Sequence, residues 1–444
     1  MTLSSLQVLS GNVSQADWDR VQYYSRKVKS LVLYDDHVRV HPSTYIRIAQ
    51  LLQSTSLFPS LRHIAQYINN VDITHIFLFL SPLLESLELS SISGFENAII
   101  GPFLATLSSL MLRRISLTGE MSVDILKKNL VHFKQLRYLE LSDSVYMSDF
   151  TLWEVIGTLP SLTGLTLQAT DPASHPAHDV ENPDHQSGGP EYFAALEHLC
   201  VVGSFIFIQH LLGFIDSPCL TTIEIYLVID HDLSDHEHEP DFDSRLTPSM
   251  TIIASKWSQS LKHLSISPNE NSFKAAQRYP ISKCLVLLTF LHEVEVIHLF
   301  WKMKNVDDNV RRLVMSWPKL WILNFDLDYI YISLSTLRII AENCPELRNL
   351  KTGIRLESST IPPFDTSSKS LHHNLEVLTV GRAYPSTSTV TQASLECQIQ
   401  VTQHLDFMFP YLKSIEIRPP ILEDVTWSGI HDLIKLCQNA RRLK

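Results

Sequence analysis

The sequence is short of glycine and of paired cysteine, and it contains no long apolar run. Only 13 of its 444 residues are glycine. Its six cysteines lie far apart and form no CxxC pair, which argues against a zinc module or a disulfide framework. Residues 1–7 have neither the basic start nor the apolar run of a signal peptide, and the apolar stretch at residues 73–80 is too short to span a membrane. We therefore expect reduced thiols and a cytoplasmic or nuclear protein.

The sequence also contains fewer basic than acidic residues. Lys and Arg together number 36 against 47 Asp and Glu, so the formal net charge is -11. This balance argues against a general affinity for nucleic-acid phosphates or anionic membranes, although it is compatible with a local basic patch. We expect neither nucleic acid nor membrane as a partner.

Motifs of catalysis and of cofactor binding are missing as well. The sequence contains no GxSxG, HExxH, GxxxxGK or GxGxxG pattern, which removes the common signatures of hydrolases, metalloproteases and nucleotide-binding enzymes. Cys344 and Cys437 are expected to fill small spaces at helix–strand turns. We predict a protein that is not an enzyme, with no catalytic residue, no cofactor and no metal site.

What the sequence does contain is a repeated phrase. The two copies are Phe133-Lys-Gln-Leu136-Arg-Tyr-Leu139-Glu-Leu141 and Leu159-Pro-Ser-Leu162-Thr-Gly-Leu165-Thr-Leu167. Both have leucines at offsets 0, +3 and +5, counted from Leu136 in the first copy and from Leu162 in the second. The +3 and +5 side chains point to the same face of a short strand. Residues 148–156, between the two copies, have helical apolar spacing behind a Ser-Asp start. One unit therefore reads strand, loop, helix and turn, which is the pattern of a leucine-rich repeat.

The same apolar triplet recurs along the whole chain, with a base period of 23 to 28 residues. A single unit cannot bury enough apolar surface to fold alone, so the units must stack. We predict an α/β fold, a leucine-rich-repeat solenoid of the ribonuclease-inhibitor-like horseshoe type, with a parallel sheet on the concave face and helices on the convex face. It would be one array over residues 1–444. The fourteen central residues of the triplets are Leu31, Ile64, Leu87, Ile115, Leu139, Leu165, Leu199, Ile223, Leu264, Ile297, Leu323, Leu350, Leu378 and Ile415.

Three segments depart from the period. Residues 437–443 look like the turn and first half of a fifteenth, partial copy. Residues 171–190 and 230–248 are polar and are expected to be flexible loops. Within the second loop, residues 230–243 hold three histidines and seven carboxylates, a composition able to bind zinc or nickel loosely. A mobile acidic loop is the favoured interpretation, because ligands in a flexible loop are not preorganised.

Side chains that flank the inward positions should line the concave sheet. Fourteen strands at about 4.8 Å give an arc of roughly 65 Å, far larger than a metabolite and suited to a protein surface. We therefore predict a protein ligand and a monomeric receptor. The candidate contact residues are Glu88, Arg114, Tyr138, Glu140, Thr166, Gln168, His198, Glu224, Tyr226, His263, His298, Asp326, Lys351, Glu416 and Arg418.

Two local phrases resemble the F-box/leucine-rich-repeat proteins expanded in fungi. Asp17-Trp18-Asp19-Arg20-Val-Gln-Tyr-Tyr24-Ser-Arg-Lys-Val28-Lys-Ser-Leu31 is similar to the segment that follows the F-box. Ala341-Glu-Asn-Cys344-Pro345-Glu-Leu347-Arg-Asn-Leu350 is similar to the cysteine-containing repeat of that family. The likeness extends over nearly the whole chain.

The resemblance implies a non-enzymatic scaffold, the substrate-receptor portion of an SCF-type ubiquitin ligase. In that family an F-box docks on a Skp-type adaptor and the repeats hold the substrate. No F-box precedes Asp17 in this sequence, so a Skp-type adaptor is expected as a partner only if an F-box lies upstream. The alternative is a stand-alone leucine-rich-repeat scaffold or regulator without a ubiquitin role.

Overall fold

A computed structural model gives the fold of the 444-residue chain. It describes residues 6–7, 13–33, 39–52, 55–68, 73–108, 110–142, 150–169, 192–229, 242–269, 272, 280–327, 329–356, 371, 373–381, 395–418 and 425–443. The expected loop at residues 171–190 and the part of the second loop at residues 230–241 lie outside these ranges.

The fold is α/β, and its main sheet has 15 strands, all parallel to their neighbours. A separate pair of short strands, β1 (Leu6–Gln7) and β3 (Arg39–Val40), is also parallel. The chain divides into two compact units. Unit 1 comprises Met1–Gly203 and Phe214–Cys219, and unit 2 comprises Ser204–Gly213 and Leu220–Lys444.

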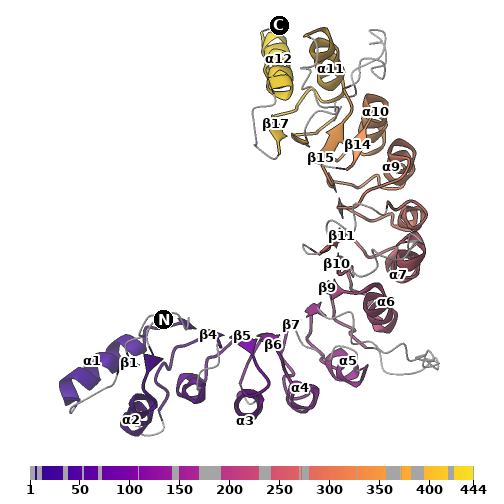
Figure 1. Cartoon of the computed structure of the whole chain (residues 1–444). Coiled ribbons are helices and arrows are strands. Elements are labelled where there is room, and N and C mark those ends of the chain that lie inside the picture. Colours follow the sequence, from indigo (N-terminus) through magenta and orange to yellow (C-terminus); the bar gives the residue numbers. More distant parts are fainter. Residues whose placement is uncertain are drawn as a thin grey trace. The chain divides into compact units, whose positions relative to one another are not determined.

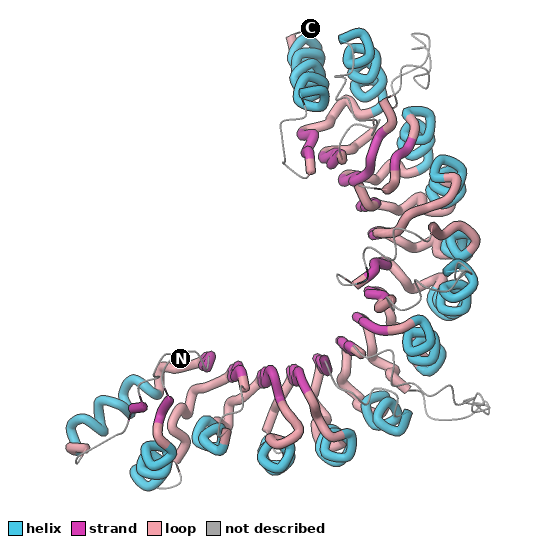
Figure 2. Tube along the Cα trace, viewed as in Figure 1, coloured by secondary structure: helices cyan, strands magenta, loops and turns pink. Residues whose placement is uncertain are grey.

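Unit 1 alternates strands with helices (Figure 1). Its strands of the main sheet are β2 (Ser30–Leu33), β4 (His63–Tyr67), β5 (Ser86–Ile92), β6 (Arg114–Gly119), β7 (Tyr138–Ser142), β8 (Gly164–Gln168) and β9 (His198–Gly203). Its helices are α1 (Gln15–Ser25), α2 (Pro42–Leu52), the 3-10 helix η1 (Thr74–Phe79), α3 (Asn97–Leu107), α4 (Val123–Leu130) and α5 (Phe150–Gly157). The helices α2 to α5 and η1 line one face of these strands (Figure 2).

Unit 2 continues the same alternation, with strands β10 (Thr222–Leu227), β11 (His263–Pro268), β12 (Val296–Leu299), β13 (Ile322–Phe325), β14 (Tyr331–Ile332), β15 (Asn349–Ile354), β16 (Val377–Val380) and β17 (Ser414–Ile417). Its helices are α6 (Phe205–Phe214), α7 (Phe242–Trp257), the 3-10 helix η4 (Cys284–Phe290), α9 (Val306–Val314), α10 (Leu334–Asn343), α11 (Leu395–Met408) and α12 (Val425–Arg442). Helices α6 to α11 again line one face (Figure 2). In each unit we call the opposite face of the sheet the open face.

The predicted triplets set the register of both units. In unit 1 the central residues pair strand to strand from Leu31 to Leu199, and in unit 2 they pair from Ile223 to Ile415. Thirteen of the fourteen are buried, and Leu31, on the first strand of its row, is half-buried. The +3 residues therefore point toward the helices, as the alternation predicts.

Two inward positions carry polar residues, Gln66 of β4 and Thr352 of β15, and both are buried. Gln66 follows Ile64 by two residues on β4 and is buried. Its Nε2 atom lies 3.2 Å from Nε2 of His75 on η1, and the His75 ring stacks on Tyr45 at 4.7 Å between centroids. This contact between two polar side chains replaces the second leucine of the triplet.

Two predicted boundaries are wrong. Residues 242–248 are not loop, because α7 begins at Phe242 and contains Pro248. Residues 437–443 are not a turn and strand, because α12 runs from Val425 to Arg442. In this helix Gln438 donates to the carbonyl of Leu412 at 2.8 Å, and Arg441 pairs with Asp406 of α11. These contacts fix the last described residues as a helix packed on its neighbour.

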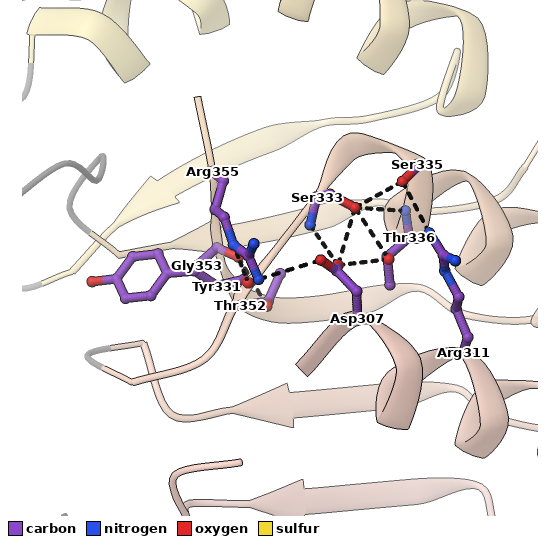
Figure 3. A network of polar contacts seen from close by, with 9 residues as sticks. All are labelled: Asp307, Arg311, Tyr331, Ser333, Ser335, Thr336, Thr352, Gly353 and Arg355. Carbon is purple, nitrogen blue, oxygen red and sulfur yellow. Dashed lines mark hydrogen bonds and ion pairs between the residues drawn. The ribbon is translucent and has the colours of Figure 1, made fainter. Parts of the chain in front are cut away.

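The start of one helix is repeatedly held by the helix before it. Asp307 in the first turn of α9 accepts hydrogen bonds from the Ser333 N–H at 2.8 Å and from the Thr336 hydroxyl at 2.6 Å, both at the start of α10 (Figure 3). Arg355 approaches the same carboxylate at 3.3 Å. Burial alone raises the pKa of Asp307, but these hydrogen bonds and the Arg355 charge outweigh it and hold the pKa below its ordinary value.

The same arrangement occurs at two other helix starts. Asp243 in the first turn of α7 is buried and accepts from the Ser282 and Cys284 N–H groups at the start of η4. In unit 1, Asn97 of α3 accepts from the Ser122 N–H at the start of α4 at 3.1 Å. Helix N-termini expose N–H groups without intrahelical partners, and here the preceding repeat supplies the acceptors.

Candidate functional site

The candidate residues on the open faces fall into rows fixed by strand register. In unit 2 one row crosses six strand pairs, and it contains four of the predicted contact residues: Glu224, His298, Lys351 and Glu416. Its members, in spatial order, are Glu224, Ser265, His298, Asn324, Lys351, Thr379 and Glu416. Side chains at one register position share a face, so these polar groups form a continuous line.

A groove lies where this row crosses β10, β11 and β12. Its volume is about 340 Å³. It is lined by Thr222, Ile223, Glu224, Tyr226, His263, Leu264, Ser265, Ser267, Val296, His298 and Phe300. Four predicted contact residues therefore meet at one place, namely Glu224, Tyr226, His263 and His298.

Hydrogen bonds and ring contacts order the groove lining. The Tyr226 hydroxyl donates to Oε2 of Glu224 at 3.2 Å. The ring of His298 meets that of Phe300 edge-on, with 6.0 Å between centroids. Lys351 places its Nζ atom 5.0 Å from the Phe300 centroid, a cation–π contact. The groove thus has an acidic end at Glu224 and an aromatic end at Phe300 that is already bordered by a cation.

The groove holds His298 in its neutral form. Burial is the main cause of a lowered pKa at His298, and the charges of His263 and Lys351 lower it further, whereas Glu224 acts in the opposite direction. Asn324 lies 3.4 Å from Nδ1 of His298 on the neighbouring strand. At neutral pH His298 is therefore an uncharged ring with one donor and one acceptor nitrogen.

The predicted contact residues Glu416, Arg418 and Asp326 of unit 2 lie outside the groove lining. Glu416 is exposed and accepts from the Thr379 hydroxyl at 3.3 Å, and Arg418 is exposed just past the end of β17. Asp326 follows β13 and is only 6% exposed. The prediction that Asp326 lines an accessible surface is wrong, because its side chain is buried just past the end of β13.

Unit 1 carries the other predicted residues on its own open face. Glu88, Glu140 and Thr166 share one register row, and Arg114, Tyr138 and His198 share the next. Gln168 lies two residues beyond Thr166 on β8 and is half-buried. These side chains are spread over the five strands β5 to β9.

The contacts among them are those of an exposed surface. Arg114 lies 3.8 Å from Glu140, with more than a third of each side chain exposed, so the pair contributes little to stability. His198 lies 3.9 Å from Glu197. The Tyr138 side chain is 47% exposed and lies over Gly164 of β8. The two rows are therefore accessible to a large partner.

Metal binding and thiol chemistry find little support in the described residues. Within the described ranges no group of three or more His, Cys, Asp or Glu side chains is placed to hold a metal ion. The acidic, histidine-rich residues 230–241 lie outside those ranges. Cys344 is fully buried, with its sulfur 3.5 Å from the Trp317 carbonyl, and burial raises its pKa to about 12. Its thiol remains protonated at neutral pH, so it is not a nucleophile.

Several residues of the groove and of the helix caps were not predicted from the sequence. Ser267 and Val296 line the groove but stood in no predicted contact set. A signal for both was present, since each flanks an inward residue of its triplet. The capping residues Asp243 and Asp307 gave no signal, because their partners lie 39 and 26 residues away.

Comparison with known proteins adds no assignment. No protein-family model matches the chain, and none of the curated proteins gives a significant match. Among the described helices, none is both long enough and apolar enough to cross a membrane.

Proposed function

We propose that the chain is a leucine-rich-repeat solenoid that recognises another protein and catalyses no reaction. The observation that carries this proposal is the register of the fourteen apolar triplets, which turns every second side chain of successive strands to the open faces. A succession of short parallel strands with exposed polar and aromatic side chains suits an extended protein surface. The groove of unit 2 would hold side chains of the bound protein.

The groove has the composition of an anchor point in a protein interface. Phe300, Tyr226 and His298 supply aromatic surface, and Glu224 supplies one charge. Aromatic residues in desolvated pockets carry a large share of interface energy. We expect the bound protein to place its main contact here.

By family resemblance, we further propose that the chain is the substrate-receptor portion of an SCF-type ubiquitin ligase. The support is the likeness of α1 and β2, at residues 17–31, and of the Cys344 repeat to fungal F-box/leucine-rich-repeat proteins. In this role the open faces hold the substrate, and a Skp-type adaptor would bind an F-box upstream of residue 1.

Two experiments separate the parts of this proposal. Affinity capture with the full-length native product should recover a Skp-type adaptor and a cullin. Failure to recover either would remove the ubiquitin role and leave a stand-alone scaffold. For the recognition role, proteins captured by the wild type should be lost from a Glu224→Lys/Phe300→Ala variant.

The control for the recognition role is Arg312→Glu, a charge reversal on an exposed site of α9 away from the open face. It should retain the proteins that the groove variant loses. Equal loss from both variants, or from neither, would contradict the assignment of the groove as the contact site.

A further inference from the structure

A row of basic side chains lies where the chain of unit 1 enters its strands. Its residues directly precede β4, β5, β6 and β7, together with Lys29 before β2. Backbone hydrogen bonds, each 2.8 Å long, join them in order from one to the next. We call this set the basic edge row, and its members are Lys29, Arg62, Glu85, Arg113 and Arg137. We propose that the basic edge row binds an extended acidic segment of a protein partner.

The row carries a surplus of positive charge. It contains four cations and one carboxylate, and Glu85 is already paired with Arg62 at 3.0 Å. The side chains of Lys29, Arg113 and Arg137 are exposed, and each has no ionic or hydrogen-bonding partner among the residues that the structure describes. Arg113 and Arg137 are unpaired cations before neighbouring strands, and Lys29 is a third at the other end of the row. This surplus is unexpected in a chain with a formal charge of -11, and the repulsion between Arg113 and Arg137 is relieved when an anion binds.

The fold does not require this surplus, because the same position in unit 2 is internally paired. There Lys262 bonds to Glu295 at 2.9 Å, and Lys413 bonds to Glu376 at 2.8 Å. The guanidinium of Arg348 lies 5.4 Å from the centroid of the Trp321 ring. Each basic residue of that row thus has its own neighbour, whereas most of those in unit 1 have none. The difference indicates that the basic edge row serves a ligand outside unit 1.

The dimensions of the row fit an extended peptide. From Lys29 to Arg137 there are four strand steps of about 4.8 Å, or roughly 19 Å, which corresponds to about six extended residues. Guanidinium groups such as those of Arg113 and Arg137 bind carboxylates through paired hydrogen bonds. The row adjoins the open face, since Arg113 and Arg137 directly precede Arg114 and Tyr138. A protein lying on the open face can therefore place an acidic segment on the row.

A protein segment fits better than a nucleic acid. The row is short and offers few unpaired cations, and the remainder of this acidic chain repels a long polyanion. The inference rests on the proposed protein-recognition function, but it requires neither the groove of unit 2 nor the ubiquitin role.

The test uses the full chain and a fluorescein-labelled peptide with six consecutive glutamates between glycine spacers, followed by fluorescence anisotropy at low salt. The row variant is Arg113→Glu/Arg137→Glu. The matched control is Arg20→Glu/Lys128→Glu, which makes the same change in net charge at two exposed positions of unit 1 outside the row. Circular dichroism melting verifies that both variants fold.

We expect the row variant to bind the peptide about tenfold more weakly than the control variant, and added salt to weaken wild-type binding. The groove variant Glu224→Lys/Phe300→Ala should bind this peptide like the wild type. Failure of the groove proposal and failure of the row proposal therefore give different results. Equal affinity of row and control variants overturns the proposal. So does tighter wild-type binding of a single-stranded oligonucleotide of matched charge, which would assign the row to nucleic acid.

Discussion

The ring of Tyr138 on β7 lies across the backbone of Gly164 on the paired position of β8. A Cβ atom at residue 164 would come within 2.4 Å of Cδ1 of Tyr138. The absent side chain therefore lets the aromatic ring come close to the neighbouring strand, at the start of the open face and next to the basic edge row. Glycine here provides space for a neighbouring residue.

A double-mutant cycle measures this relationship. Gly164→Ala should lower the free energy of unfolding by about 1 kcal/mol, because the ring must swing into solvent. In a Tyr138→Ala background the same change should be neutral or stabilise by about 0.5 kcal/mol, because alanine loses less backbone entropy on folding than glycine. Urea unfolding of the four proteins gives the coupling energy. A coupling energy near zero would contradict the contact.

Two further glycines, Gly119 and Gly213, should respond to substitution in opposite directions. Gly119 has a φ of 119°, and an added Cβ would lie 2.2 Å from the backbone oxygen of Ile92. Gly119→Ala should therefore cost about 3 kcal/mol or more, since backbone atoms must shift. In α6 a Cβ at Gly213 would meet nothing within 4 Å, so Gly213→Ala should stabilise by about 0.5–1 kcal/mol. Thermal or urea unfolding of each variant checks the two signs.

The carboxylate of Asp307 stabilises the start of α10. Asp307→Ala leaves the Ser333 N–H and the Thr336 hydroxyl without their acceptor and should cost about 1–3 kcal/mol. Asp308→Ala is the control, because Asp308 is exposed in the same first turn of α9 and makes no such bond. It should change stability by about 0.5 kcal/mol or less. Similar losses for the two variants in urea unfolding would show that helix-terminal charge, and not capping, explains the effect.

Stability should depend on pH through His373. This buried ring lies 2.6 Å from the Cys344 carbonyl through Nε2 and accepts from the Leu375 N–H through Nδ1. Burial lowers its pKa below the ordinary value of 6.5, although the bond to Cys344 acts in the opposite direction. The unfolded chain therefore takes up a proton first as pH falls, and stability that is present above pH 6.5 is lost as pH falls through the folded-state pKa.

The measurement compares urea unfolding at pH 7.5 and pH 5.5. The loss of stability between these values should be smaller in His373→Gln than in the wild type, because glutamine carries no titrating group. The histidines His298 and His431, whose pKa values are also lowered by burial, remain in both proteins. An unchanged loss in the variant would falsify the role of His373.

Local pattern predicted much of the fold because alternation and helical spacing are properties of neighbouring residues. A local signal marks the start of α10, where Ser333 accepts from the Thr336 N–H as an N-cap. The start of α7 and the C-terminal part of α12 were not predictable in this way. Pro248 is a typical helix-start signal, but Asp243 holds an earlier turn through contacts with residues 282 and 284. Residues 437, 440 and 443 have a spacing shared by helices and by the repeat turn.

The sequence by itself determined which side chains face inward and which face outward, because a strand turns alternate residues to opposite faces. It also determined the parallel order of the strands, because each is separated from the next by a helix or a long connection. Only the tertiary structure decided which outward residues meet. Strand pairing brought Glu224, His263 and His298 to one groove, although 74 positions separate the first from the last in the sequence. It also left Arg113 and Arg137 adjacent and unpaired. The reason in both cases is that neighbours across a sheet are set by register and not by distance along the chain.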